Sequence, residues 1–233
     1  MTIEYRFALD DHEPELHYII ATDASEQGNL QPTAPAKWTR LKNNQCVNCP
    51  LDAKKHEFCP AAVDIQNVVE DVGALPAIKK ARVRVIAPER EYAKQTSLEE
   101  GVRSLMGLLM ANSACPILNK LKPMALTHLP FASQREFILR SVSTYLLRQY
   151  FLVGDKTKGD WSLRGLIELN KQLQLVNQAM WQRVNSAHQG EANLKALLSF
   201  FSMAASVSYS LETQLQKIKP EFLAESNLGS FDL

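Results

Sequence analysis

Hydrophobic and polar residues alternate along the first part of the chain, and this pattern predicts strands. The first set of apolar positions is Ile3, Tyr5, Phe7 and Leu9. A period of two is typical of a strand with one buried face. The turn-forming segment 10–14 and the apolar run 18–20 then predict a hairpin return. A second alternation over 81–87 predicts another strand, and 90–95 is expected to pair with it.

Helical spacing of apolar residues appears at 60–72 and again after residue 96. Two Ser-x-x-Glu sequences, at 97–100 and 133–136, are capping boxes that predict helix starts. We expect the second of these helices to reach about residue 150. Asp160 is expected to cap a longer helix through Val184, with Trp181 on its inward side.

A last long helix is predicted from about 191 to 218, where Pro220 would end it. The helices that start near 133, 160 and 191 would then form a three-helix bundle. A stripe of small residues on the last helix would let helix backbones approach closely, in the bundle or in a homodimer. These small residues are Ala204, Ala205 and Ser208.

Together these patterns predict an α+β fold, with a small antiparallel N-terminal sheet that carries a cysteine-rich loop and a C-terminal helical bundle. We divide the chain into a β-rich part at 1–95, the bundle at 96–220 and a tail at 221–233. The 233 residues are 45% hydrophobic and 22% charged, which is ordinary globular usage. Such a chain can bury a core without disulfides.

The charge pattern gives no reason to expect a nucleic-acid or membrane partner. The formal net charge is only +1, so no overall field draws the chain to an anionic surface. The N-terminal sequence lacks the basic start and apolar run of a signal peptide, and no apolar stretch is long enough to cross a bilayer. We therefore expect a reducing, cytoplasmic setting, with an unknown protein or small molecule as partner.

The cysteines are the strongest candidate chemistry. Cys46 and Cys49 form a CxxC, Cys59 follows after nine residues, and Cys115 lies much further along. In a reducing compartment such a group is more often a metal site than a set of disulfides. Four thiolates suit tetrahedral zinc and also an iron–sulfur cluster. We favour zinc, with the cluster as the alternative.

Proline follows three of the four cysteines, at positions 50, 60 and 116. Because proline is favoured in the first position of a helix, Cys59 and Cys115 are each expected to cap a helix. His56 lies in the same segment and is an alternative fourth ligand to Cys115. On this interpretation the protein is a structural or regulatory metal-binding module. The alternative is a redox protein that uses an iron–sulfur cluster or the pair Cys46 and Cys49.

A second, weaker candidate is a polar site. His128 precedes the second capping box, and Asn170 and Asn177 lie on or beside the apolar face of the 160–184 helix. Buried amides need partners, so these residues form either an internal polar network or a small-ligand pocket. A hydrolase or transferase based on His128 has the least support, because no triad spacing accompanies it.

Several short sequences also resemble a known family. They are Cys46-x-x-Cys49-Pro50-Leu51, Cys59-Pro60, Ser113-Ala114-Cys115-Pro116, His128-Leu129-Pro130-Phe131 and the segment 145–151. Over nearly the whole chain the sequence resembles a family of uncharacterised bacterial proteins known as a domain of unknown function. The resemblance implies a bacterial cytosolic setting and no assigned activity.

Overall fold

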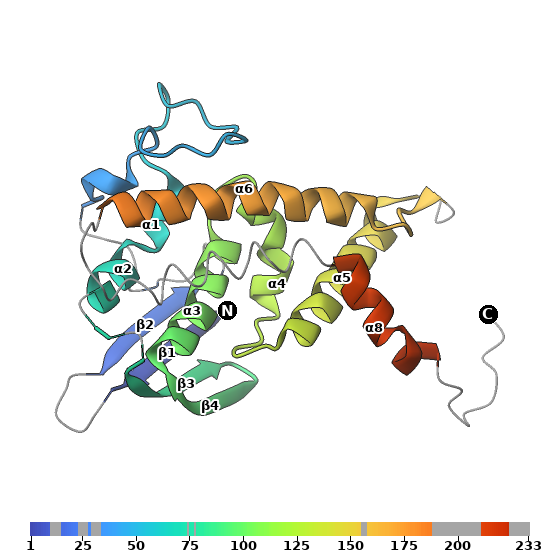
Figure 1. Ribbon diagram of the computed structural model, residues 1–233, viewed down its shortest axis with the longest axis horizontal. Coiled ribbons are helices and arrows are strands. Elements are labelled where there is room, and N and C mark those ends of the chain that lie inside the picture. Colours follow the sequence, from blue (N-terminus) through green and yellow to red (C-terminus); the bar gives the residue numbers. More distant parts are fainter. Residues whose placement is uncertain are drawn as a thin grey trace.

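A four-stranded sheet and a set of helices make up the chain, as predicted (Figure 1). The computed structural model describes residues 1–9, 15–22, 28, 34–73, 75, 76, 78–154, 158–187 and 211–223. Within these ranges the fold is α+β, and the predicted fold class is confirmed. No helix in the described ranges is long and apolar enough to cross a membrane.

The sheet is antiparallel throughout, with the order β2-β1-β3-β4. Its strands are β1 (Thr2–Ala8), β2 (Leu16–Ala21), β3 (Lys80–Ala87) and β4 (Arg90–Ser97). Alternate residues of β1 and β3 are buried, as the period of two predicts. Tyr5 and Phe7 are fully buried at the centre of this face, so β1 and β3 supply the middle of the core.

Helix α3 (Leu98–Asn112) packs on the buried face of the sheet. Ser97 caps it by accepting a hydrogen bond from the backbone N–H of Glu100, as expected. Gly101 lets the helix approach closely, because a Cβ there would lie 2.7 Å from the Phe7 ring and 2.8 Å from Val83. The absence of this side chain therefore sets how near α3 lies to β1 and β3.

Short helices connect the sheet, the cysteines and α3. They are η1 (Lys37–Thr39), α1 (Pro60–Asp64), α2 (Gln66–Gly73), η2 (Leu118–Leu121) and α4 (Lys122–Leu126). The predicted helix 60–72 is thus two helices with a break at Ile65, whose buried side chain lies in the core. Spacing of apolar residues cannot reveal such a break, because both pieces bury the same side.

Two long helices follow. α5 (Gln134–Leu152) begins with the predicted capping box, in which Ser133 and Glu136 bond reciprocally. α6 (Arg164–Ala187) begins three residues later than a cap at Asp160 predicts. Asp160 still serves the helix start, because its Oδ2 accepts a hydrogen bond from the N–H of Gly165 at 2.7 Å. The predicted inward position of Trp181 is wrong, because 37% of this residue is exposed.

The last described helix, α8 (Leu211–Leu223), continues through Pro220 instead of ending before it. The residues around Pro220 are exposed, so water can satisfy the carbonyl group that proline leaves without a donor. Residues 188–210, with most of the predicted helix 191–218 and its small-residue stripe, lie outside the described ranges. So does the predicted tail beyond residue 223.

The core has two clusters, and α6 belongs to both. The larger joins the sheet, α1 to α4 and the part of α6 that carries Val176, Met180 and Val184. The smaller joins α5, α6 and α8 around Ile138, Leu166 and Leu211. Figure 1 shows α6 running along one side of the body, with the cysteine-rich segment at one end and α5 and α8 at the other.

Candidate metal centre

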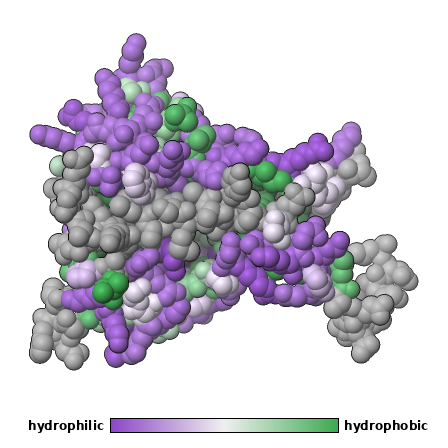
Figure 2. Space-filling model, in the orientation of Figure 1, coloured by the Kyte–Doolittle hydropathy of each residue, from purple (hydrophilic) through white to green (hydrophobic). Residues whose placement is uncertain are grey.

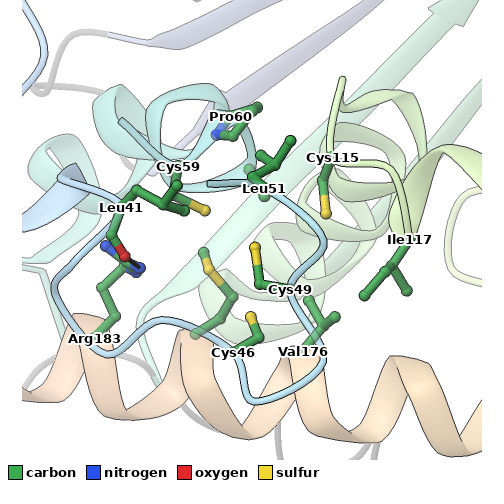
Figure 3. A pocket seen from close by; sticks show the side chains of 12 residues that line it. Leu41, Cys46, Cys49, Leu51, Cys59, Pro60, Cys115, Ile117, Val176 and Arg183 are labelled. Carbon is green, nitrogen blue, oxygen red and sulfur yellow. Dashed lines mark hydrogen bonds between the residues drawn. The ribbon is translucent and has the colours of Figure 1, made fainter. Parts of the chain in front are cut away.

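The four cysteines line one small cavity, although they come from three separate places in the chain (Figure 3). Cys46 and Cys49 lie in a turn, Cys59 precedes α1, and Cys115 follows α3. All four are free thiols. In Figure 3 their sulfur atoms face the same space. Cys59 and Cys115 are 7% and 8% exposed, while Cys46 and Cys49 are half-buried.

The cysteine loop, residues 41–59, is closed at its base by backbone hydrogen bonds. The N–H of Leu41 donates to the carbonyl of Glu57, and the N–H of Cys59 donates to the carbonyl of Thr39, both at 2.8 Å. A second turn sits inside the loop, where the N–H of Cys49 donates to the carbonyl of Cys46 at 3.0 Å. This turn holds the two CxxC side chains on the same side of the chain.

Cys59 is the residue before α1, with Pro60 in the first turn, as predicted. The backbone N–H of Ala62 donates to the carbonyl of Cys59 at 3.0 Å, which closes the first turn. The matching prediction for Cys115 is wrong, because Pro116 opens a turn that leads into the 3-10 helix η2, which Ile117 precedes. A proline after cysteine is compatible with the first position of a helix and equally with a turn, so the Cys-Pro sequence alone does not distinguish the two.

Ser113 lies between Cys115 and Asp64 of α1. The N–H of Cys115 donates to the Ser113 hydroxyl oxygen at 3.1 Å. Burial raises the pKa of the Asp64 carboxyl, and the nearby Ser113 hydroxyl opposes this effect. The turn after α3 is therefore held against the helix that follows Cys59, and these two cysteines are positioned together.

The rest of the cavity wall is apolar apart from one arginine. The apolar wall comes from Leu41, Leu51, Pro60, Ala61, Ile117, Val176 and Met180. The cavity has a volume of about 10 Å³, close to the smallest space that holds one water molecule. A space of this size matches a single small atom or ion.

Ligation by all four thiols sets a stricter geometric condition than a shared cavity. Among the residues that the structure describes, no group of three or more histidine, cysteine, aspartate or glutamate side chains is arranged so that it could hold a metal. A zinc–thiolate bond is about 2.3 Å long, so ligation requires the thiols to lose their protons and the four sulfur atoms to lie within that distance of one ion.

The surroundings of Cys46 and Cys59 favour the protonated form of these two thiols. Burial, with smaller contributions from the thiols of Cys59, Cys49 and Cys115 and against the opposing effect of Arg183, raises the pKa of Cys46 to about 12. Burial also raises the pKa of Cys59, against the opposing effects of Arg183 and the Ala62 N–H. A divalent cation reverses this preference, because a coordinating thiol is deprotonated.

Arg183 of α6 joins the cavity to the base of the cysteine loop. Its Nη1 donates to the carbonyls of Trp38, at 3.0 Å, and Arg40. Its Nη2 donates to the carbonyls of Leu41 and Asn44, at 3.3 and 3.4 Å. Asn44 has a positive φ of 47°, a conformation that asparagine tolerates better than most residues. One side chain thus binds four backbone carbonyls between residues 38 and 44 and holds the loop base against α6.

Residues 3–223 match a protein family described as a domain of unknown function, DUF6901. The chain belongs to this family. The resemblance read from the sequence is therefore confirmed, over almost the whole length. No curated protein and no solved structure was found to match the chain.

The other predicted site residues lie elsewhere. His56 is exposed and is not part of the cavity wall, whereas Cys115 is. His128 Nε2 lies 2.6 Å from the hydroxyl of Tyr5, which also bonds Ser104. Asn170 and Asn177 are buried on α6. The structure does not bring the histidine and these amides into one described pocket.

Sequence reasoning missed Arg183 as part of the candidate centre. It lies 124 residues beyond Cys59, on a helix whose polar positions mostly face solvent. A signal was nevertheless present, since Arg183 falls three residues after Met180 and seven after Val176, on the apolar side of α6. A charged residue in an apolar stripe indicates a buried partner.

Proposed function

We propose that the protein is a metal-binding module in which Cys46, Cys49, Cys59 and Cys115 hold one zinc ion as four thiolates. The observation that carries the proposal is that all four cysteines line one cavity with their sulfur atoms toward it. Four protein ligands close a tetrahedral site and leave no position for substrate, which is typical of structural zinc. We expect a structural or regulatory role in a cytoplasmic setting.

The size of the cavity favours a single ion over a cluster. A space of about 10 Å³ accepts one ion, whereas an iron–sulfur cluster brings several irons and sulfides and needs more room. The surroundings also disfavour the alternative redox pair. A reactive dithiol needs a thiol of lowered pKa, and burial raises the pKa of Cys46 to about 12.

Zinc would fix the cysteine loop to the rest of the molecule. The loop contributes Leu41 and Cys59 to the buried core and is largely exposed between them. Four bonds to one ion would join the loop, the start of α1 and the turn after α3. Because such a site is absent in the unfolded chain, binding free energy at it is also folding free energy.

The test is the metal content and colour of protein purified without oxygen. We expect a colourless protein with one zinc per chain, which after exchange into cobalt shows the absorption of a tetrahedral thiolate site. A brown protein with iron and sulfide would instead establish the cluster. Protein that binds neither metal, with four thiols that titrate freely, would overturn the proposal.

A further inference from the structure

Arg183 brings a full positive charge to the wall of the thiol cavity. The residue is 1% exposed. Its described partners are the four backbone carbonyls at the base of the loop, and these are neutral. Within the described ranges, no carboxylate forms an ion pair with it. A buried charge is costly unless an opposite charge lies near it.

The Nε atom of Arg183 indicates where the opposite charge would lie. Nε of Arg183 is buried and has no hydrogen-bond partner among the residues that the structure describes. Cys59 and Cys46 are near enough to interact electrostatically with the guanidinium. In Figure 3 Arg183 reaches from α6 to the same space as the labelled cysteines. A buried N–H without an acceptor, on a side chain that lines the thiol cavity, is suited to a thiolate acceptor.

We propose that Arg183 is the built-in counter-ion of the metal centre, and that its Nε–H donates a hydrogen bond to the metal-bound thiolate of Cys59 or Cys46. This inference rests on the proposed function. Four thiolates around a divalent ion carry a net charge of −2, and the guanidinium reduces it to −1. The same side chain binds the carbonyls at the loop base. The positive charge that stabilises the thiolates is therefore held in place by the same contacts that hold the loop.

Cadmium NMR on the wild-type protein tests the contact directly. Cadmium has the same closed d shell as zinc and prefers thiolate ligands. With ¹¹³Cd bound and the protein labelled with ¹⁵N, we expect an arginine Nε–H signal that exchanges slowly and couples to the metal through sulfur. Its disappearance in Arg183→Lys assigns it. An Arg183 Nε–H signal that is the same with and without cadmium would overturn this inference alone, whereas failure to bind cadmium or zinc would overturn the proposed function as well.

Two variants separate the charge from the hydrogen bonds to the loop. Arg183→Lys and Arg183→Gln both lose the planar fork that binds the carbonyls, but only lysine keeps the charge. We expect Arg183→Gln to weaken zinc binding about 10–100-fold, as supporting residues around metal sites typically do, and Arg183→Lys to weaken it much less. Chelator competition measures both. Equal losses in the two variants would show that only the loop contacts matter; if the glutamine variant does not fold, the cadmium experiment decides.

Discussion

The sheet and the cysteine loop are held in place by different interactions. In the sheet, complete ladders of backbone hydrogen bonds run beside a row of fully buried side chains that includes Tyr5 and Phe7. In the loop, residues 42–57 are exposed or half-buried. Its surface in Figure 2, above α6, is mostly hydrophilic with scattered hydrophobic residues. The loop is therefore held by polar contacts to α6 and by the region of the four thiols, and not by an apolar core of its own.

This difference predicts which part of the protein depends on metal. Apolar burial supplies about 25 cal/mol for each Å² removed from water, and the sheet with α3 has such burial in plenty. A largely polar loop of this length buries little apolar surface, and its ordering costs conformational entropy. We therefore expect the sheet to fold without metal and the loop to become ordered with it.

The largest effect should come from the sheet. Phe7→Ala removes a ring that is fully buried and that contacts Tyr5 and Tyr18 at centroid distances of 6.0 and 5.9 Å. We expect a loss of about 3–5 kcal/mol in the free energy of unfolding, measured by urea denaturation with a chelator present. Val47→Ala in the loop is the control, because Val47 is 88% exposed and should change stability by less than about 0.5 kcal/mol. Similar losses for the two would contradict the comparison.

Removal of one thiol should act on the loop instead. Cys115→Ser replaces an anionic ligand with a neutral hydroxyl, and it leaves the sheet unchanged. We expect zinc affinity to fall by at least about 10–100-fold, the usual cost of changes just outside the ligand shell. That is about 1.4–2.7 kcal/mol. Competition with a chromogenic chelator measures it.

His56→Ala is the matched control for this experiment, since His56 is in the loop but exposed and outside the cavity wall. It should bind zinc as tightly as the wild type. Loss of zinc in His56→Ala together with full metal content in Cys115→Ser would mean that the histidine is the fourth ligand, and the four-cysteine centre would be wrong.

The sequence predicts the sheet well because the pattern and the packing agree there. The alternation at Ile3, Tyr5 and Phe7 requires one buried face, and each of these residues is buried. The capping box at Ser133 is similarly local, because its donor and acceptors lie within four residues. The sequence pattern did not predict the break at Ile65, because apolar spacing continues across it. It also did not predict that α8 continues through Pro220, where the surrounding chain is exposed to water.

The residues of the candidate centre also fall into those that the sequence predicts and those that depend on distant contacts. Residue type and short spacing were enough to group the four cysteines, and they do line one cavity. Arg183 could not be derived from spacing, because its role depends on how α6 crosses the loop base. Asn48 was missed for the same reason: its Nδ2 donates to the backbone and side-chain oxygens of Gln172, 124 residues away.

Acid should weaken the sheet region through His128, whose half-buried ring lies against Tyr5. Burial, with a smaller contribution from the positive charge of Arg140, lowers the pKa of His128 to about 3. The unfolded chain takes up this proton near pH 6.5, so the stability due to neutral His128 is complete above that pH. It is lost progressively as the pH falls from about 6.5 toward 3.

The measurement is the urea midpoint of metal-free protein between pH 7 and pH 5, which removes competition between protons and metal at the thiols. In the tautomer without a proton on Nε2, this nitrogen can accept a hydrogen bond from the Tyr5 hydroxyl, whereas in a protonated ring both nitrogens are donors. His128→Gln retains an acceptor and does not titrate, so its midpoint should vary less with pH. Identical pH dependence in the two proteins would show that the His128 contact does not contribute.

The smallest effect, and the most local, is expected at Asn48. Asn48→Ala removes hydrogen bonds of 3.1 and 2.7 Å from Nδ2 to the backbone and side-chain oxygens of Gln172. A hydrogen bond contributes about 0.5–1.5 kcal/mol net. The substitution also removes Oδ1, which is buried without a partner among the described residues, and this partly offsets the loss. The net change in global stability should therefore be under about 1 kcal/mol. Because the contact lies in the loop, hydrogen exchange should quicken at residues 45–51 and stay unchanged in β1 and β3. Faster exchange in the strands would mean that the loop and the sheet unfold as one unit.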